Sequence, residues 1–146
     1  MSTLKQQAHV TWDCTYHIIF IPKYRKKVLY GQVRQRIGEI LRELARQKDV
    51  EVVQGTACPD HIHLILSIPP KYSVADVIGF LKGKSAIRLH YEFGKRYRLT
   101  NKCFWARGYF VRTVGIDRQA AEEYVKRQLD EDKRDDNDPQ LDLNWN

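Results

Sequence analysis

A chain of 146 residues with 42% apolar and 29% charged residues fits one globular domain with its own core, and no apolar run is long enough to span a membrane. The net charge of +7 is uneven, because residues 129–146 hold seven acids and two bases, which leaves 23 bases and 11 acids in residues 1–128. A body with a net charge of +12 is expected to attract polyanions, nucleic acid first, although a merely charge-decorated surface would also account for it.

The first half of the chain predicts a strand, a helix and two further strands. The segment "HVTWDCTYHIIFIP" is rich in β-branched and aromatic residues and predicts a strand at about 9–21 that ends before Pro22. Apolar residues then recur at helical spacing and predict a helix over roughly 32–48. The segments "VEVVQGTAC" and "HIHLILSI" predict two strands joined by a tight turn at Pro59-Asp60.

The second half predicts a helix, a hairpin and a last helix. Ser73 can cap a helix that runs to about Gly94. The segment "KCFWARGYFVRTVG" predicts a hairpin that turns at Arg107-Gly108, and Asp117 can cap the last helix. The order β-α-β-β-α-β plus a helix predicts an α+β, ferredoxin-like or RRM-like antiparallel sheet, with two helices on one face and the other face open.

Two histidines, His61 and His63, stand one residue apart at the start of the third predicted strand. Because side chains alternate across a strand, the two imidazoles share one face, while the apolar residues between and after them form a row on the other. That row is Ile62, Leu64, Leu66 and Ile68. Two imidazoles ~7 Å apart along a strand can converge on one metal ion. Satisfied polar histidines at a sheet surface are the alternative interpretation.

A third metal ligand is less evident from the sequence. By residue type the candidates include His9, His17 and His90, which we interpret as structural side chains. Cys14, Cys58 and Cys103 are far apart, form no CxxC pair and suit reduced thiols in a cytoplasm, so we interpret each as a small buried hydrophobic residue.

The last predicted helix offers a better partner for the histidines. Tyr124 and Gln128 stand four residues apart on one helical face. A Gln amide oxygen is a suitable ligand for Mg²⁺ or Mn²⁺, and a metal that holds a phosphodiester could prepare it for attack by the tyrosine hydroxyl. The alternative is that Tyr124 is a core aromatic residue in the apolar stripe of this helix.

These residues resemble a known family. "DHIHLIL" resembles the His-hydrophobe-His (HUH) motif of single-strand DNA nucleases, and "YVKRQ", with Tyr124 and Gln128, is similar to the catalytic helix of the single-tyrosine HUH transposases, TnpA, of the smallest bacterial and archaeal insertion sequences. The blocks "TWDCTYHIIFIPKYRKKVLYG", "DHIHLILSIPPKYSVADVIGFLKGKSA" and "FWARGYFVRTVG" also read like this family, so the likeness runs from about 9 to 131.

The resemblance implies an enzyme that cleaves and rejoins single-stranded DNA. His61, His63 and Gln128 would bind a divalent metal, Mg²⁺ or Mn²⁺, and Tyr124 would form a covalent 5′-phosphotyrosine and release a 3′-OH. The enzyme would act as a homodimer, with active sites that can form in trans, on DNA hairpins near the element ends. It implies a cytoplasmic prokaryotic protein, associated with the nucleoid when bound to DNA. A single transposase domain would span 1–131. The acidic composition of 132–146 predicts a flexible tail, which is the main feature in which this sequence departs from the family.

Further residues are candidates for supporting roles. Positive charge beside aromatic rings is typical of single-strand binding. The candidate DNA contacts are Lys82, Lys84, Trp105, Arg107 and Arg112. A solvated helix face and a half-buried aromatic hairpin would explain them equally well. Asp60 could orient an imidazole from behind or simply serve the turn.

Three alternative functions remain open at this point. A repeat-associated tyrosine transposase that processes palindromic repeats would share the chemistry and differ in its biological role. A replication-initiator nickase of the same HUH superfamily fits the compact chain less well. A non-catalytic, RRM-like single-strand-binding module would explain the basic body, but would leave the combination of His61, His63, Gln128 and Tyr124 as a coincidence.

Overall fold

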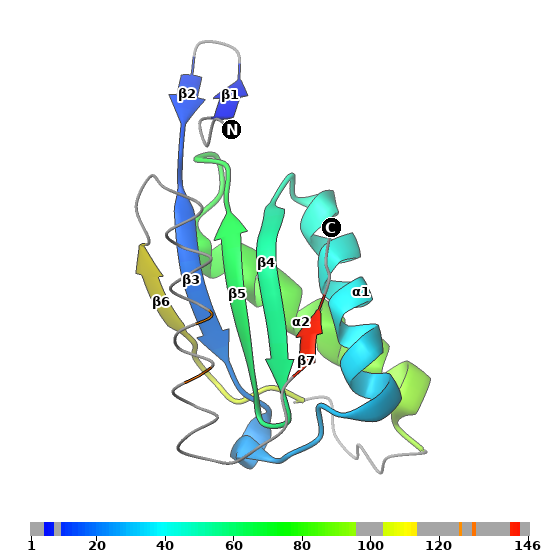
Figure 1. Cartoon of the computed structure of the whole chain (residues 1–146). Coiled ribbons are helices and arrows are strands. Elements are labelled where there is room, and N and C mark those ends of the chain that lie inside the picture. Colours follow the sequence, from blue (N-terminus) through cyan, green and yellow to red (C-terminus); the bar gives the residue numbers. More distant parts are fainter. Residues whose placement is uncertain are drawn as a thin grey trace.

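Five antiparallel strands form the central sheet of the protein (Figure 1). The structure, a computed structural model, describes residues 5–7, 10–95, 104–113, 126, 130 and 141–143. In spatial order the strands are β6 (Phe110–Thr113), β3 (Thr15–Phe20), β5 (His61–Ser67), β4 (Glu51–Cys58) and β7 (Leu141–Leu143). The four strands from β6 to β4 have the order expected of a split βαβ unit, so the predicted ferredoxin-like α+β fold is confirmed.

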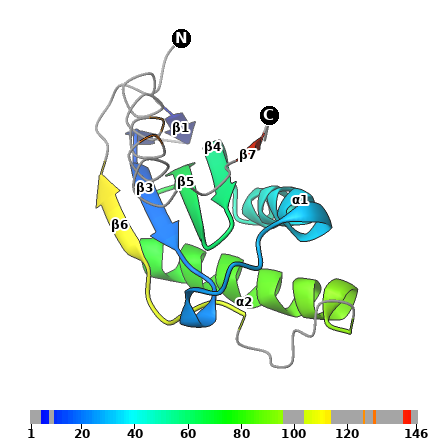
Figure 2. The ribbon, with the colours of Figure 1, turned by 60° about the horizontal axis from the view of Figure 1, so that its bottom comes forward.

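Two helices cover one face of this sheet, as Figure 2 shows. They are α1 (Gly31–Gln47) and α2 (Val74–Phe93). The α2 helix begins where predicted, because the Ser73 hydroxyl accepts a hydrogen bond from the backbone N–H of Asp76 at 3.0 Å. The α1 helix ends at Gln47 and is followed, after Lys48, by the left-handed residue Asp49, and the Val50 N–H bonds to the Ala45 carbonyl at 2.9 Å.

The core lies between the helices and the sheet. The predicted apolar row of β5 faces this core, since Ile62, Leu64 and Leu66 are fully buried against side chains of both helices. Burying each such side chain stabilises the fold by ~1.5–3 kcal/mol. This packing fixes the register of β5, because a one-residue slip would turn the row away from the helices.

The strand predicted at 9–21 is divided into two. Its first part is β2 (Val10–Trp12), which pairs with β1 (Lys5–Gln7) in a small separate sheet, and its second part is β3. The break falls at Asp13, whose carboxylate accepts a hydrogen bond from the Thr15 hydroxyl at 2.8 Å. Such a local side-chain bond competes with strand pairing and favours a turn.

The prediction of a hairpin at Arg107-Gly108 is wrong, because the residues before and after this dipeptide both pair with the same segment, residues 19–22. Ala106 N–H bonds to the Ile21 carbonyl at 2.8 Å, and Trp105 forms an isolated antiparallel bridge with Pro22. Further along, Phe110 pairs with Ile19. From Trp105 to Phe110 the chain therefore has two more residues than its partner has from Pro22 to Ile19. Gly108 takes a φ of 78°, and the dipeptide is therefore part of a bulge.

Part of the predicted tail takes up ordered structure. Within 132–146, residues Leu141–Leu143 form β7, which pairs antiparallel with Gly55, Thr56 and Ala57 of β4 (Figure 1). The remaining residues of that range lie outside the described part of the chain. Among the described residues, no helix combines the length and the apolar character that crossing a bilayer requires.

Candidate metal centre

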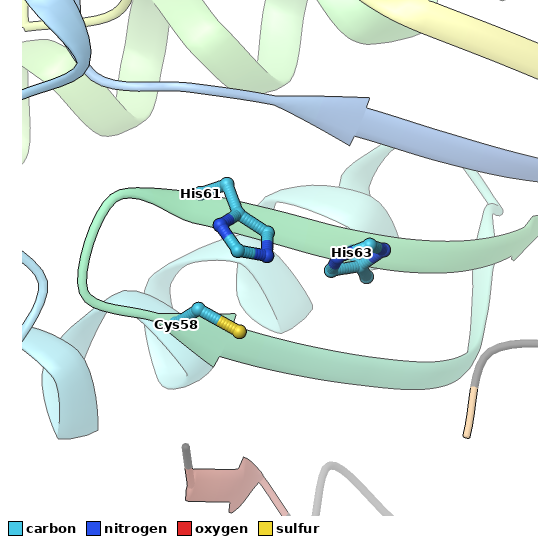
Figure 3. Close-up of side chains that lie close together, drawn as sticks. All are labelled: Cys58, His61 and His63. Carbon is cyan, nitrogen blue, oxygen red and sulfur yellow. The ribbon is translucent and has the colours of Figure 1, made fainter. Parts of the chain in front are cut away.

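His61 and His63 lie on the face of β5 that points away from the helices. Their ring centroids are 4.7 Å apart with the ring planes at 74°, so the two imidazoles share a face as predicted (Figure 3). The expectation that this face is open is wrong, because only 7% of His61 and 1% of His63 is exposed. The pair therefore stands in a buried environment, where electrostatic interactions are stronger than in water.

Asp60 holds the ring of His61 from behind. Its Oδ1 lies 2.6 Å from His61 Nδ1, and its Oδ2 accepts a hydrogen bond from Arg25 Nε at 2.8 Å. Burial alone would raise the pKa of Asp60, but the hydrogen bond and charge of His61, together with Arg25, outweigh it and lower the pKa. An ionised Asp60 fixes Nδ1 as the bonded nitrogen, so that Nε2 is the atom through which His61 would bind a metal.

His17 of β3 supports the ring of His63. The two rings stack at a centroid distance of 5.6 Å, and His17 Nε2 lies 3.3 Å from His63 Nδ1. Burial, then the charges of His61 and His17, lower the pKa of His63 to about 3. Burial and the charge of Arg112 lower the pKa of His17 to about 4. Both imidazoles are thus neutral at neutral pH, which is the form that ligates metals.

Cys58 completes the cluster from the neighbouring strand. It is the cross-strand partner of His61 in the β4–β5 pairing and is buried. One candidate ligand atom from each of Cys58, His61 and His63 lies within 4.8 Å of the others, and Figure 3 shows the sulfur directed toward the rings. Two imidazoles and a thiol at this separation fit a divalent metal ion after a small closing movement.

Two members of this site, His17 and Cys58, were assigned structural roles from the sequence. Pairwise register between strands is what brings His17 beside His63, and a single sequence does not reveal it. For Cys58 a signal was available, because a tight turn at Pro59-Asp60 makes Cys58 and His61 the two flanking residues of a hairpin.

Tyr124 and Gln128, the predicted nucleophile and third ligand, lie outside the described residues. Of the last predicted helix, Lys126 and Asp130 are described, and both are helical and exposed. The roles of Tyr124 and Gln128 therefore stay predictions.

Two of the predicted DNA contacts are engaged inside the protein. Trp105 is 6% exposed, packs edge-on against Phe20 and donates Nε1–H to the Ser85 hydroxyl at 2.9 Å, so the structure assigns it to the core and not to a base-stacking surface. Lys82 Nζ donates to the carbonyls of Ala106 and Gly108, both at 2.7 Å. Its ammonium thus holds the bulge before β6, and burial lowers its pKa.

The other predicted contacts are at the surface. Lys84 on α2, Arg107 in the bulge and Arg112 on β6 are all exposed. Arg112 is also the cross-strand partner of His17, which explains why its charge acts on that ring. Because these three side chains are exposed, their contacts with DNA phosphates stay a prediction.

Comparison with known proteins identifies the family. The family model "Transposase IS200 like" matches residues 10–128. The chain belongs to the IS200-like transposase family. It is 46% identical over 134 residues to the transposase of insertion sequence element IS200 from Salmonella typhimurium, covering 91% of this chain and 88% of that protein.

Solved structures agree with this assignment. A crystal structure from Deinococcus radiodurans R1, described as a candidate transposase, has a TM-score of 0.68 at 32% identity and covers 85% of this chain and 96% of that one. A REP-associated tyrosine transposase bound to a REP hairpin has a TM-score of 0.56 at 15% identity, covering 75% and 61%, and shows the shared fold. The family supports a DNA-cleaving and strand-transferring enzyme of a mobile element.

Proposed function

We propose that this IS200-like transposase cleaves and rejoins single-stranded DNA at insertion-sequence ends through a covalent bond to Tyr124. The observation that carries the proposal is the buried imidazole pair, His61 and His63, in which Asp60 Oδ1 lies 2.6 Å from His61 Nδ1. A buried histidine pair with a carboxylate behind it is typical of metal sites. In a chain of this family, such a site supports phosphodiester chemistry.

The residues proposed to hold the metal are His61, His63 and Gln128. Bound Mg²⁺ or Mn²⁺ would bind the scissile phosphate and favour attack on its phosphorus. The described residues prepare the two rings for this role, since Asp60 sets the orientation of His61 and the contact with His17 Nε2 sets that of His63. Burial keeps both nitrogen ligands in defined positions at little entropic cost on binding.

The proposed strand transfer needs no external energy source, because the covalent bond to tyrosine conserves the energy of the broken phosphodiester. The Tyr124 hydroxyl loses its proton and its oxygen forms a bond to phosphorus, while the bond from phosphorus to the 3′ oxygen breaks and that oxygen gains a proton. The product is a 5′-phosphotyrosine and a free 3′-OH. Attack by another 3′-OH on the phosphotyrosine reverses the exchange, so one phosphodiester is made for each one broken.

We further propose that the substrate is a DNA hairpin near each element end and that the enzyme is a homodimer. The net charge of +12 over residues 1–128 supports a polyanionic partner. The hairpin in the REP-associated relative is a precedent for this type of ligand in the same fold. In a dimer, His61 and His63 of one chain could work with Tyr124 of the other.

Covalent capture tests this function. Incubation of the full chain with single-stranded element ends and Mg²⁺ or Mn²⁺ should give a protein–DNA adduct on a denaturing gel. Tyr124→Phe should abolish the adduct and leave binding nearly unchanged. Tyr91→Phe is a matched control, because Tyr91 is 90% exposed on α2, and this variant should retain the adduct.

The same experiment separates the proposal from a non-catalytic RRM-like binding module. A binding module would retain the DNA without forming an adduct under any metal condition. Adduct formation by Tyr124→Phe, or cleavage that persists in excess EDTA, would contradict the proposed mechanism.

A further inference from the structure

We propose that Cys58, His61 and His63 form a thiolate-containing site that selects zinc-class ions, and that such an ion competes with Mg²⁺ or Mn²⁺ for the two histidines. The site itself stands on the geometry of the described residues, and the competition rests on the proposed function. The consequence is that one pair of imidazoles serves two alternative ligand sets. One set adds the amide of Gln128 and the other adds the sulfur of Cys58.

The position of Cys58 follows from the turn between β4 and β5. The two-residue turn at Pro59-Asp60 makes Cys58 the direct partner of His61, so both side chains project from the same face of the sheet. The ligand atoms of the cluster lie within 4.8 Å of one another. Tetrahedral bonding with Zn–N of ~2.0 Å and Zn–S of ~2.3 Å needs separations of about 3.3–3.6 Å, so side-chain movements of about 1 Å close the site.

The donor set determines the class of ion. A sulfur with two imidazole nitrogens suits Zn²⁺ and similar ions, whereas Mg²⁺ prefers oxygen ligands. Three protein ligands also leave a fourth position for water or substrate. On binding, the Cys58 thiol loses its proton to solvent and the sulfur forms the bond to the metal, so the charge of the ion is partly neutralised within the buried cluster.

A second buried group points to a ligand at the same place. Thr56 is fully buried and is the cross-strand partner of His63 on the face that carries the cluster. Its hydroxyl has no hydrogen-bond partner among the described atoms. A buried hydroxyl in that condition costs free energy, and a water or thiolate bound to a metal in the cluster would supply a partner.

Sharing of the histidines makes the two ligand sets mutually exclusive. An ion held by Cys58, His61 and His63 occupies both imidazoles, so Gln128 cannot complete its own set around a second ion. Because nitrogen and sulfur sites bind Zn²⁺ much more tightly than Mg²⁺, low concentrations of Zn²⁺ should displace the harder ion. Zinc-class metals should therefore inhibit the Mg²⁺-dependent reaction through Cys58.

Cobalt spectroscopy of the full-length, metal-free protein tests the site without using activity. Co²⁺ adopts zinc-type sites, and a bond to thiolate gives a near-ultraviolet charge-transfer band. We expect this band in the unmodified protein, and Cys58→Ser should remove it and weaken Co²⁺ binding by about tenfold or more. Cys14→Ser and Cys103→Ser are matched controls that should keep it. A band that persists in Cys58→Ser, or that is absent from the unmodified protein, would overturn the proposal.

Two further measurements keep the result unambiguous. X-ray absorption of the Zn²⁺-loaded unmodified protein should show sulfur at ~2.3 Å, and it needs no variant that could fail to fold; a shell of nitrogen and oxygen alone would overturn the proposal. Tyr124→Phe should retain the cobalt band. A cobalt band without any DNA adduct would thus contradict the proposed function alone, whereas an adduct without the band would contradict this site alone.

Discussion

Asp60 Oδ1 lies 2.6 Å from Nδ1 of His61, its neighbour in sequence, while its other oxygen binds Arg25 at 2.8 Å. The carboxylate is therefore clamped between a cation and an imidazole and has a lowered pKa. The two roles predicted for Asp60 are therefore compatible, because the residue occupies the turn and contacts the ring at the same time. We propose that Asp60 and Arg25 are positioning residues for the candidate metal centre.

Asp60→Asn should weaken metal binding more than it weakens the fold. An amide keeps the shape of the turn but loses the charge that fixes the tautomer of His61, and substitutions of this kind reduce metal affinity by roughly 10–100-fold. Calorimetric titration with Mn²⁺ measures the change. Asp76→Asn, at an exposed position on α2, is the control and should bind as the unmodified protein does. Equal affinities for Asp60→Asn and its control would contradict the positioning role.

The metal-free protein should lose stability as pH falls from about 6.5 toward 4. In the folded chain burial lowers the pKa of His17 to about 4, whereas the unfolded chain has the ordinary value near 6.5. Between these values the unfolded state binds more protons, so the stability present above pH 6.5 is lost as pH decreases. Together with His63, whose pKa is about 3, the loss should be on the order of 5 kcal/mol by pH 4.5, with each histidine contributing about half.

Urea denaturation at several pH values in EDTA measures this slope. His17→Phe keeps a ring against His63 but removes a proton site, so the dependence on pH should become shallower. His90→Gln, on the exposed side of α2, should leave the slope unchanged. A slope that is identical in all three proteins would contradict the assignment of these pKa values.

The parts of the fold that the sequence predicted correctly depend on local patterns. Alternation along β5 placed Ile62, Leu64 and Leu66 on the core face, and the hydroxyl of Ser73 marked the start of α2. These features involve residues that are close in sequence, and short-range geometry determines them.

The parts that were missed depend on contacts between distant residues. Burial of the histidine face was not predicted, because a polar residue at alternate strand positions is compatible with either a solvated or a covered face. The Arg107-Gly108 dipeptide is equally suited to a turn and to a bulge, and it is the pairing of the flanking residues with one neighbouring strand, Trp105 with Pro22 and Phe110 with Ile19, that distinguishes them. His17 lies beside His63 because of the register between β3 and β5, and no local sequence pattern determines that register.

The end of α1 offers a stabilising substitution. Asp49 has a φ of 54°, a left-handed conformation that favours glycine, and its N–H bonds to the Arg46 carbonyl at 3.1 Å. Asp49→Gly should raise the free energy of unfolding by about 0.5–1 kcal/mol, because the relief of backbone strain exceeds the added freedom of the unfolded chain. Thermal unfolding measures it. Both Asp49→Gly and Asp49→Ala remove the exposed ion pair with Lys71, so the difference between them isolates the backbone. Asp49→Ala keeps the strain and should destabilise, and a gain there would contradict the argument.

Substitution of Lys82 and of Lys84, two residues apart on α2, should distinguish a lysine that stabilises the fold from one that binds DNA. Lys82 donates to two main-chain carbonyls at 2.7 Å, so Lys82→Met should lower the free energy of unfolding by about 2 kcal/mol. Lys84 is exposed, so Lys84→Met should leave stability unchanged and weaken binding of single-stranded DNA, with a salt dependence reduced by about 0.7 in log–log slope. Chemical denaturation and binding titrations at several salt concentrations measure both effects. The reverse pattern would show that Lys82 contacts DNA and that its bonds to the bulge are dispensable.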